Sequence, residues 1–362
     1  MQMQMQSKEL NFEGHNIYVG LDVHKKSWTV SVVMNDIILK TFSQDADAVA
    51  LHRYLTKNYP GAQYYSAYES GFCGFWPHFK LIELGINNIV VNAADVPTSQ
   101  KDKTQKDDRR DSRKIARSLS KGDMTAIHVP DVSVQSDRSL VRTRWALVKD
   151  MVRSRLRIKA FLSVYGISYP PEFSSSTTHW SKRFMKWLRD INLPHSTAKD
   201  SLDAMIDQFE SQRVHLLEIT RKIRKMSRSE KYQRNITLLD TLPGIGLITS
   251  ITILTELGNI DRFKDSDHLA AYVGLVPTCH SSGEKQNRGG MTFRHNERLL
   301  QMIIESSWSA MRKDPGLTLS YSNYRKRMNQ NNAIIRIARK LVNRIYAVLK
   351  HQKEYKCGIN NK

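Results

Sequence analysis

The chain has 362 residues, of which 40% are hydrophobic, so it is long enough for two folded domains, each with its own core. Its formal net charge of +21 at pH 7 attracts polyanions, which makes nucleic acid the expected partner. No apolar run approaches the roughly 18 residues that a membrane-spanning helix needs, and residues 1–10 lack the apolar core of a signal peptide. We therefore expect a cytoplasmic protein without a membrane segment.

The cysteines lie far apart in the sequence, at Cys73, Cys279 and Cys357. They form no CxxC pair, and no histidine cluster with zinc-ligand spacing lies near them. We therefore expect reduced thiols rather than a disulfide framework or a zinc finger.

The N-terminal part of the sequence predicts a mixed sheet covered by helices. Runs of β-branched and aromatic residues at 17–23 (IYVGLDV) and 28–33 (WTVSVV) predict a hairpin. Further strands are predicted at 64–69 (YYSAYE) and 88–92 (NIVVN), and a helix between them ends at Gly85. Strands that first form a hairpin and then alternate with helices are typical of an α/β layer architecture.

Helices are predicted along the middle of the chain. In the charge-dense segment 101–121, small and apolar residues at helical spacing predict a helix that begins near Asp107. Two long helices are predicted at 139–164 and 201–226. The stretch 169–180 between them (YPPEFSSSTTHW) is rich in Pro and Ser, which favours a loop or an insertion. The apolar positions of the long helices suit either a coiled-coil-like contact with a second copy or packing within the chain.

The sequence LPGIG at 242–246 predicts a tight turn between two helices, the helix-hairpin-helix pattern. Gly244 and Gly246 would let the backbone approach a DNA phosphate, and the N–H groups that begin the next helix are natural anion donors. A purely structural helical hairpin is the alternative. A short helix at 269–272, a Gly- and Ser-rich loop and two helices, the last at 334–350, complete the chain.

Four carboxylates are candidates for a metal site. Asp22 and Glu69 each end a predicted strand, and Asp108 and Asp111 lie one helical turn apart on one helix face. Mg²⁺ prefers hard oxygen ligands, and several like charges at one point are costly without a cation. Each residue also has a structural interpretation, as a turn or cap residue or as the partner of a neighbouring arginine. Asp107 is an alternative to Asp108, although it would point elsewhere on the helix.

The segment 274–296 (GLVPTCHSSGEKQNRGGMTFRHN) contains a candidate nucleophile. A serine beside a glycine can attack phosphorus while nearby cations hold the phosphate and stabilise charge in the transition state. The candidate cations are Lys285, Arg288 and Arg294. Physical reasoning alone does not separate Ser281 from Ser282 as the nucleophile. The alternative is a flexible loop whose basic residues only bind phosphate.

The motifs GLDVHK, YES, DDRRDSRKIA, LPGIG, AAYVGLVP and SSGEKQNRGG occur in an order typical of one family. Over roughly residues 17–349, the chain resembles the DEDD transposases of the insertion sequence one-hundred-ten family. The resemblance implies an α/β RuvC-like, RNase H-type domain at 15–135 and a helical coiled-coil linker with an insertion at 136–232. It further implies a mainly α C-terminal transposase domain, with the helix-hairpin-helix and the serine loop, at 233–350.

The resemblance also implies a mechanism. The four carboxylates Asp22, Glu69, Asp108 and Asp111 would hold Mg²⁺ (or Mn²⁺) and position the scissile phosphate. Ser282, which directly precedes the glycine, would attack that phosphate and form a phosphoserine link, and strand exchange would follow. The active sites would be composite, with residues shared between protomers. The chain departs from the family pattern at Asp107, where a threonine is common, and in its longer linker.

The implied partners are DNA, as element ends and target, and a structured noncoding bridge RNA from the element itself that guides recombination. By the same resemblance we expect a homodimer or tetramer without membrane association. The protein would be prokaryotic and cytoplasmic, and nucleoid-associated when bound to DNA.

Two other functions fit parts of the sequence. In a RuvC-like metal-dependent nuclease or junction resolvase, the carboxylates alone would cut DNA by activating water, and Ser282→Ala would stay active. A noncatalytic nucleic-acid-binding protein would bind tightly and in a salt-sensitive manner, without metal-dependent strand cleavage.

Overall fold

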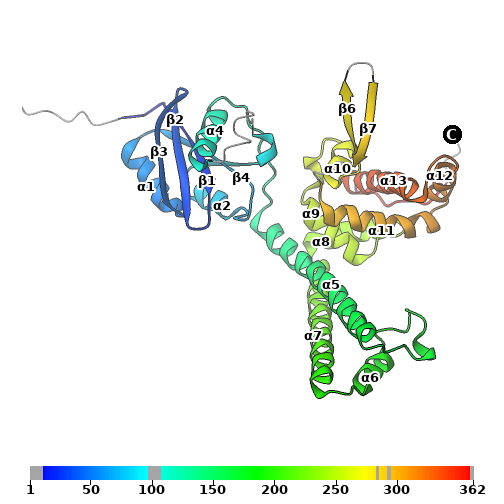
Figure 1. Cartoon of the computed structure of the whole chain (residues 1–362). Helices are drawn as coiled ribbons and strands as arrows, with labels where there is room; N and C mark the ends of the chain where they lie inside the picture. Colours follow the sequence, from blue (N-terminus) through cyan, green and yellow to red (C-terminus); the bar gives the residue numbers. More distant parts are fainter. Residues whose placement is uncertain (1–10, 97–106, 283–284, 292–294, 359–362) are drawn as a thin grey trace, which may run out of the picture. The chain divides into compact units, whose positions relative to one another are not determined.

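The computed structural model describes residues 11–96, 107–282, 285–291 and 295–358, and of residues 278–282 and 285–291 it describes the backbone. The chain divides into two compact units, with the boundary between Pro130 and Asp131 (Figure 1). Within the described ranges, no helix is both long and apolar enough to cross a membrane.

The first unit contains a five-stranded mixed sheet. Its strands are β1 (Asn16–Val23), β2 (Ser27–Met34), β3 (Ile37–Asp45), β4 (Gln63–Glu69) and β5 (Asn87–Val91). They lie in the order β3-β2-β1-β4-β5. β1 and β3 both pair antiparallel with β2, whereas β4 is parallel to β1 and β5 is parallel to β4. The predicted mixed α/β architecture is confirmed, and β3 is a strand that was not predicted from the sequence.

Helices cover both faces of this sheet. The helices α1 (Ala48–Asn58) and α2 (Trp76–Glu83) share one core with Val19 and Leu21 of β1. The helix α4 (Asp108–Ser120) lies on the other face, where Gly20 meets its backbone. Side chains alternate between the faces of a strand, so Asp22, two residues after Gly20, is on the α4 face.

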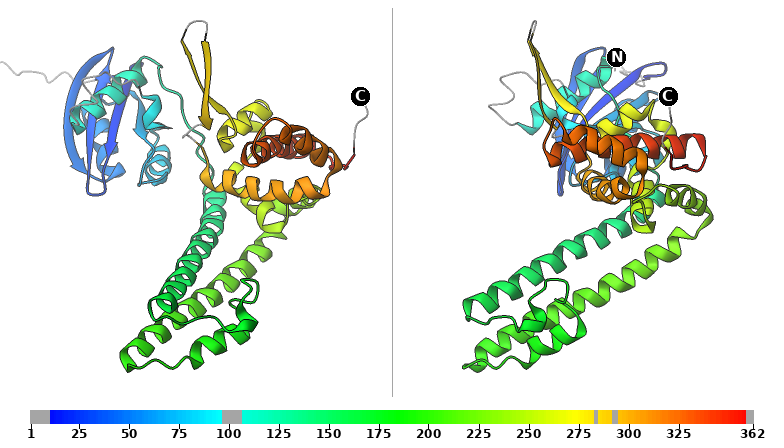
Figure 2. Two further views of the ribbon diagram at one scale, coloured as in Figure 1. Left: turned by 45° about the vertical axis from the view of Figure 1, so that its right-hand side comes forward. Right: turned by 90° about the vertical axis from the view of Figure 1, so that its right-hand side faces the viewer.

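The second unit is mainly helical, as predicted. Its two long helices, α5 (Val132–Val164) and α7 (Ser196–Ser227), lie side by side and run in opposite directions (Figure 2). The helix α6 (Lys182–Asp190) lies where α5 ends and α7 begins. Together with Phe173 from the segment before it, α6 packs on both long helices in a core rich in aromatic rings. Both long helices predicted from the sequence are therefore confirmed, whereas α6 was not predicted.

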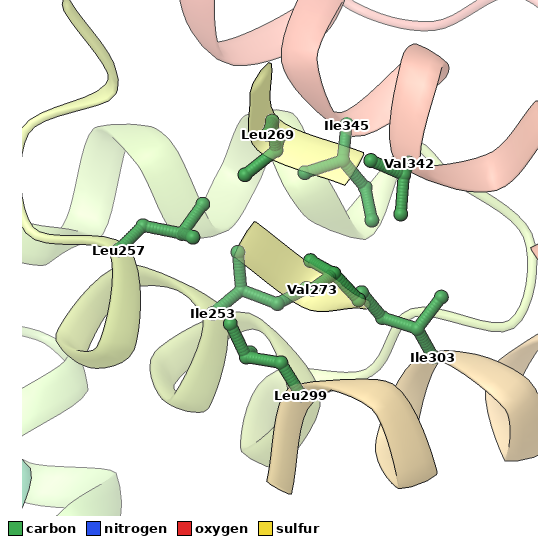
Figure 3. A pocket seen from close by; sticks show the side chains of 8 residues that line it. All are labelled: Ile253, Leu257, Leu269, Val273, Leu299, Ile303, Val342 and Ile345. Atoms are coloured by element: carbon green, nitrogen blue, oxygen red, sulfur yellow. The ribbon is translucent and has the colours of Figure 1, made fainter. Parts of the chain in front are cut away.

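The other α-helices among the described residues of this unit are α8 (Glu230–Asp240), α9 (Leu247–Leu257), α10 (Ser266–Val273), α11 (Glu297–Lys313), α12 (Pro315–Arg325) and α13 (Gln330–His351). Side chains from α9, α10, α11 and α13 converge in an aliphatic pocket (Figure 3). The pocket is lined by Ile253, Leu257, Leu269, Val273, Leu299, Ile303, Val342 and Ile345. Because none of these side chains carries a polar group to orient a ligand, the pocket belongs to the hydrophobic core.

A β-hairpin occupies the segment where a Gly- and Ser-rich loop is predicted. Its strands β6 (Pro277–Ser282) and β7 (Lys285–Met291) pair antiparallel, and the hairpin extends away from the helices of its unit (Figure 1). The prediction of a loop was wrong because strand formation depends more on cross-strand pairing than on the propensity of single residues.

Candidate functional site

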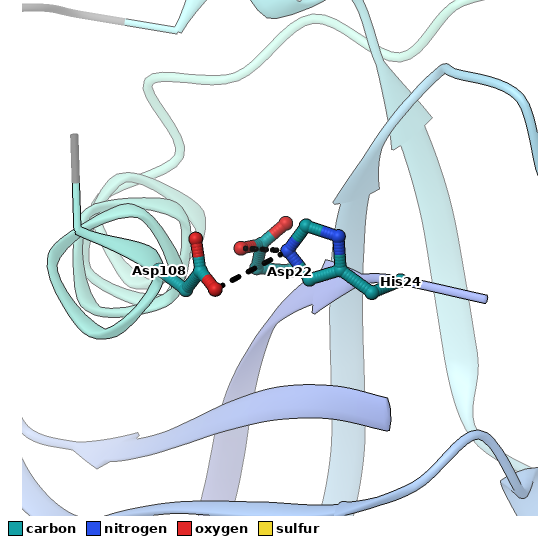
Figure 4. Close-up of side chains that lie close together, drawn as sticks. All are labelled: Asp22, His24 and Asp108. Atoms are coloured by element: carbon teal, nitrogen blue, oxygen red, sulfur yellow. Dashed lines mark hydrogen bonds and ion pairs between the residues drawn. The ribbon is translucent and has the colours of Figure 1, made fainter. Parts of the chain in front are cut away.

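Three side chains that can bind metal meet at the end of β1. His24 Nε2 lies 3.1 Å from Asp22 Oδ2 and 3.4 Å from Asp108 Oδ2 (Figure 4). One ligand atom from each residue can be chosen so that all three lie within 4.8 Å of one another. The end of β1 and the first turn of α4 therefore bring together two carboxylates and an imidazole with a spacing that could hold a metal ion.

Small residues beneath α4 allow Asp108 to approach Asp22. A Cβ added to Gly20 would lie 2.0 Å from the carbonyl oxygen of Ser112, so glycine lets the helix backbone rest directly on the strand. The hydroxyls of Ser31 and Ser112 form a buried hydrogen bond of 2.8 Å between β2 and α4. The first turn of the helix consequently lies beside the end of β1.

Glu69 occupies the corresponding position on the neighbouring strand. β1 and β4 are parallel, with Leu21 opposite Tyr68, so Asp22 and Glu69 follow as the next residues of adjacent strands. Ala67 belongs to the core under α4, and the alternation of side chains places Glu69 on that same face. Glu69 thus shares with Asp22 both the edge of the sheet and the face covered by α4.

Burial raises the pKa of Asp22 above its usual value. The neighbouring His24 lowers this pKa, whereas the negative charges of Asp108 and Asp111 raise it. The Asp22 side chain is 22% exposed. A carboxylate that is partly desolvated and surrounded by like charges is stabilised by a bound cation, so this electrostatic environment suits a metal ligand.

Asp107 and Asp108 have different environments. Asp107 is the N-cap of α4, and its side chain accepts a hydrogen bond of 3.1 Å from Arg109 N. Asp108 points instead toward Asp22 and His24 (Figure 4). Acidic residues in the first turn also stabilise a helix through its dipole, which is the structural alternative for Asp108.

His24 was not predicted as a site residue. It follows Asp22 by two positions, and residues two apart in an extended segment lie on the same face. That spacing was the available signal, but a histidine in a predicted turn gives no sign that its ring folds back onto the strand end.

Both candidate serines and two of the three candidate cations lie on the hairpin. Ser281 and Ser282 are on β6, Lys285 and Arg288 are on β7, and Arg294 lies outside the described residues. Ser282 is the last residue of β6, and the strand register places it opposite Lys285. The catalytic role of Ser282 and the phosphate-binding roles of the cations stay predictions.

The base of this hairpin is tied to the helices. Gly274 ends α10 with φ +96°, and a Cβ there would lie 2.3 Å from the His295 Cβ. Asn296 N donates to Tyr272 O at 3.1 Å, and Asn296 Nδ2 donates to Glu256 Oε2 at 2.9 Å. Residues just before β6 and just after β7 are thereby held together.

Glu256, which receives the bond from Asn296, is fully buried at the end of α9. Arg142 of α5 donates from Nε at 2.7 Å and from Nη2 at 2.8 Å to its two carboxylate oxygens. Burial alone would raise the pKa of Glu256, but the hydrogen bonds and charge of Arg142 outweigh it and hold the pKa below its usual value. A charged, bidentate pair therefore joins the long helix α5 to the base of the hairpin.

The predicted turn at 242–246 lies between α8 and α9, and its two glycines differ. Gly244 has φ +84°, and a Cβ there would lie 2.4 Å from the carbonyl oxygen of Ser306 in α11. Gly246 is exposed at the N-cap of α9, and a Cβ added there would have no other atom within 4 Å. The close approach at Gly244 therefore serves helix packing, and phosphate binding at either glycine stays a prediction.

Comparison with known proteins adds two matches. A family described as "Transposase IS116/IS110/IS902 family" matches residues 236–322, and a DEDD transposase family of the IS110 type matches residues 19–167. The second match contains the end of β1 and the start of α4, which form the group of Asp22, His24 and Asp108, and also contains Glu69 and Asp111.

Several relatives are named as transposases. A putative transposase, y4qE of Sinorhizobium fredii, is 30% identical over 68% of this chain and 58% of its own length. The transposase for insertion sequence element IS1111A of Coxiella burnetii is 26% identical, over 71% of this chain and 70% of its own. The transposase for insertion sequence element IS1533 of Leptospira borgpetersenii is 24% identical, over 81% of this chain and 84% of its own length. The chain thus spans less than two thirds of the first of these relatives.

Proposed function

The chain belongs to the IS116/IS110/IS902 family of transposases, and we propose that it cuts and rejoins DNA for an insertion sequence, using a divalent metal and a serine nucleophile. The observation that carries the proposal is the meeting of Asp22, His24 and Asp108 at the end of β1. Glu69, on the face of the sheet that α4 covers, and Asp111, whose charge acts on Asp22, lie outside this group of three and are proposed as further ligands.

The donor set fits a divalent cation. For an ion about 2.1 Å from each ligand, adjacent corners of an octahedron are about 3 Å apart. The distances from His24 Nε2 to the two carboxylates, 3.1 and 3.4 Å, are close to this edge length. When bound, Mg²⁺ or Mn²⁺ supplies a Lewis acid that polarises the scissile phosphate and stabilises its developing charge. Asp22 and Asp108 would hold the ion, with Glu69 and Asp111 as further carboxylates.

Ser282 would supply the nucleophile. Its Oγ would attack phosphorus, an Oγ–P bond would form, and the bond from phosphorus to one sugar oxygen would break, with that oxygen leaving on the cut strand end. The phosphoserine retains an ester of comparable energy, so attack by a strand end can rejoin DNA without another energy source. Lys285, opposite Ser282 in the strand register, supports this role as a nearby cation, and Arg288 and Arg294 are proposed to bind phosphate as well.

Two features of the fold and the net charge of the chain support finer parts of the proposal. The strand order β3-β2-β1-β4-β5, with two parallel strands after an antiparallel meander, favours an RNase H-type, RuvC-like domain. The turn between α8 and α9 favours a helix-hairpin-helix in which N–H groups after Gly246 bind a DNA phosphate. The net charge of +21 suits DNA and a bridge RNA together. The division at 15–135, 136–232 and 233–350, and assembly as a dimer or tetramer, belong to the same proposal.

A cleavage assay tests the metal site. Full-length protein would be incubated with labelled donor DNA, the noncoding RNA of the element and Mg²⁺. We expect Asp22→Asn and Asp108→Asn to lose strand cleavage, and chelation of the metal to do the same. Asp107→Asn is the matched control, because its side chain caps α4 and bonds away from the cluster. Cleavage that survives in Asp22→Asn would contradict the proposal.

A further inference from the structure

We propose that His24 is a direct ligand of the metal and makes the site favour Mn²⁺ over Mg²⁺. This inference rests on the proposed metal site and adds a residue outside the four carboxylates of the sequence-based prediction. The donor set of the proposed site is therefore mixed, with one nitrogen among oxygens.

The ring of His24 is oriented for this role. Its Nε2 bonds to Asp22 Oδ2, and the same atom faces Asp108 Oδ2 (Figure 4). The backbone N–H of His24 donates to Ser27 O at 3.0 Å, which fixes the residue in the turn between β1 and β2. Within the described part of the chain, the ring makes no other hydrogen bond or ion pair. Its one engaged nitrogen is thus directed at the two carboxylates.

The exposures of the three side chains leave the cluster accessible. Asp22 is 22% exposed, His24 41% and Asp108 49%. The set therefore lies at the surface of its unit, where an ion can enter from solvent and retain positions for water or phosphate.

Ligand type sets the expected preference. Mg²⁺ binds carboxylate and carbonyl oxygens and demands near-ideal octahedral geometry. Mn²⁺ also binds carboxylates but, as a first-row transition metal ion, accepts an imidazole nitrogen more readily than Mg²⁺ does. A site with one imidazole among carboxylates should therefore gain more affinity for Mn²⁺ than for Mg²⁺. Replacing the imidazole nitrogen of His24 with the amide oxygen of an asparagine should reduce the difference between the affinities for Mn²⁺ and Mg²⁺.

Electron paramagnetic resonance of Mn²⁺ bound to the full-length protein tests the assignment. Electron spin echo modulation from a directly bonded ¹⁴N should be present in the wild type and absent in His24→Asn. By titration, His24→Asn should weaken Mn²⁺ binding on the order of 10-fold or more and Mg²⁺ binding much less. The matched control is His15→Asn, an exposed histidine just before β1, which should retain the nitrogen signal and both affinities.

The outcomes separate this inference from the function on which it rests. If Mn²⁺ binding requires Asp22 but the bound Mn²⁺ shows no coupling to ¹⁴N, the role of His24 is overturned and the carboxylate site remains. Nitrogen coupling that persists in His24→Asn would also overturn it. Mn²⁺ binding that is unchanged in Asp22→Asn would contradict the proposed metal site itself, and with it the role of His24.

Discussion

Gly20 and Ser112 are in direct backbone contact, because a Cβ on Gly20 would lie only 2.0 Å from the carbonyl oxygen of Ser112. This contact sets the distance between β1 and α4. Asp22 and Asp108 are carried by these two elements, so the packing of one glycine determines whether the two carboxylates meet.

We expect Gly20→Ala to disrupt the metal site and the first unit together. The helix backbone has to move, since no flexible side chain can yield, and overpacking of this kind costs about 1–3 kcal/mol of unfolding free energy. Mn²⁺ titration and thermal unfolding measure the two effects. Gly71→Ala is the control, because its nearest non-neighbouring atom is 4.0 Å away and its φ is not in the left-handed region. Unchanged Mn²⁺ affinity in Gly20→Ala would refute the link between this packing and the site.

Asp22→Asn should stabilise the metal-free protein near neutral pH while abolishing metal binding. The pKa of Asp22 is raised by burial and by Asp108 and Asp111, so the folded state binds the proton more tightly than the unfolded state. The penalty for the charged carboxylate is therefore present above the folded pKa. It disappears as pH falls below the unfolded value of about 3.9.

Thermal unfolding over a pH series checks this sign. The melting temperature of Asp22→Asn should exceed that of the wild type at pH 7 without metal, and the two should converge in acid. Added Mn²⁺ should raise the melting temperature of the wild type alone, because binding to the folded state stabilises it by mass action. A lower melting temperature for Asp22→Asn in metal-free buffer at pH 7 is the result that speaks against this electrostatic account.

The sequence predicts those parts of the site that depend on local runs of residues. It does not predict those that depend on contacts between residues far apart in the chain. The ends of β1 and β4 were predictable, because the β-branched and aromatic runs stop one residue after Asp22 and at Glu69. Asp108 was named from the sequence as a candidate ligand together with Asp22. The packing of Gly20 on α4 that brings the two carboxylates together was not predictable, since it is a contact between residues far apart in the chain. The strand β3 was missed because its nine residues, IILKTFSQD, lack clear alternation and pair only through β2.

The pair of Glu256 and Arg142 should contribute strongly to the stability of the second unit. Glu256→Ala leaves Arg142 and Arg138 without their carboxylate partner. Because the Arg142 side chain is 41% exposed and water can solvate part of it, we expect a loss below the roughly 3–5 kcal/mol that breaking a fully buried pair costs. The matched control is Asp267→Ala, because Asp267 bonds Arg339 at 2.6 Å but its side chain is 77% exposed. Such a surface pair contributes about 0–1 kcal/mol. Denaturant unfolding compares the two, and equal losses would show that burial does not distinguish them.

Gly244 and Gly246 should respond differently to alanine. Gly244→Ala places a Cβ 2.4 Å from the Ser306 carbonyl oxygen at φ +84°, so we expect a loss of about 1–3 kcal/mol or more in stability. Gly246→Ala has open space and should fold normally, with weaker DNA binding and an unchanged salt dependence, because the substitution hinders a backbone contact to phosphate without removing a charge. Thermal unfolding and a salt series of DNA binding measure both. Full DNA affinity in Gly246→Ala would contradict the phosphate contact.

The most direct test of the proposed function is the detection of a covalent protein–DNA adduct on denaturing gels, with full-length protein, its noncoding RNA, labelled donor DNA and Mg²⁺. We expect an adduct in the wild type and in the control Ser281→Ala, and none in Ser282→Ala or Asp22→Asn. Free cleaved DNA without an adduct, persisting in Ser282→Ala, would contradict serine recombination and identify a metal-dependent nuclease instead.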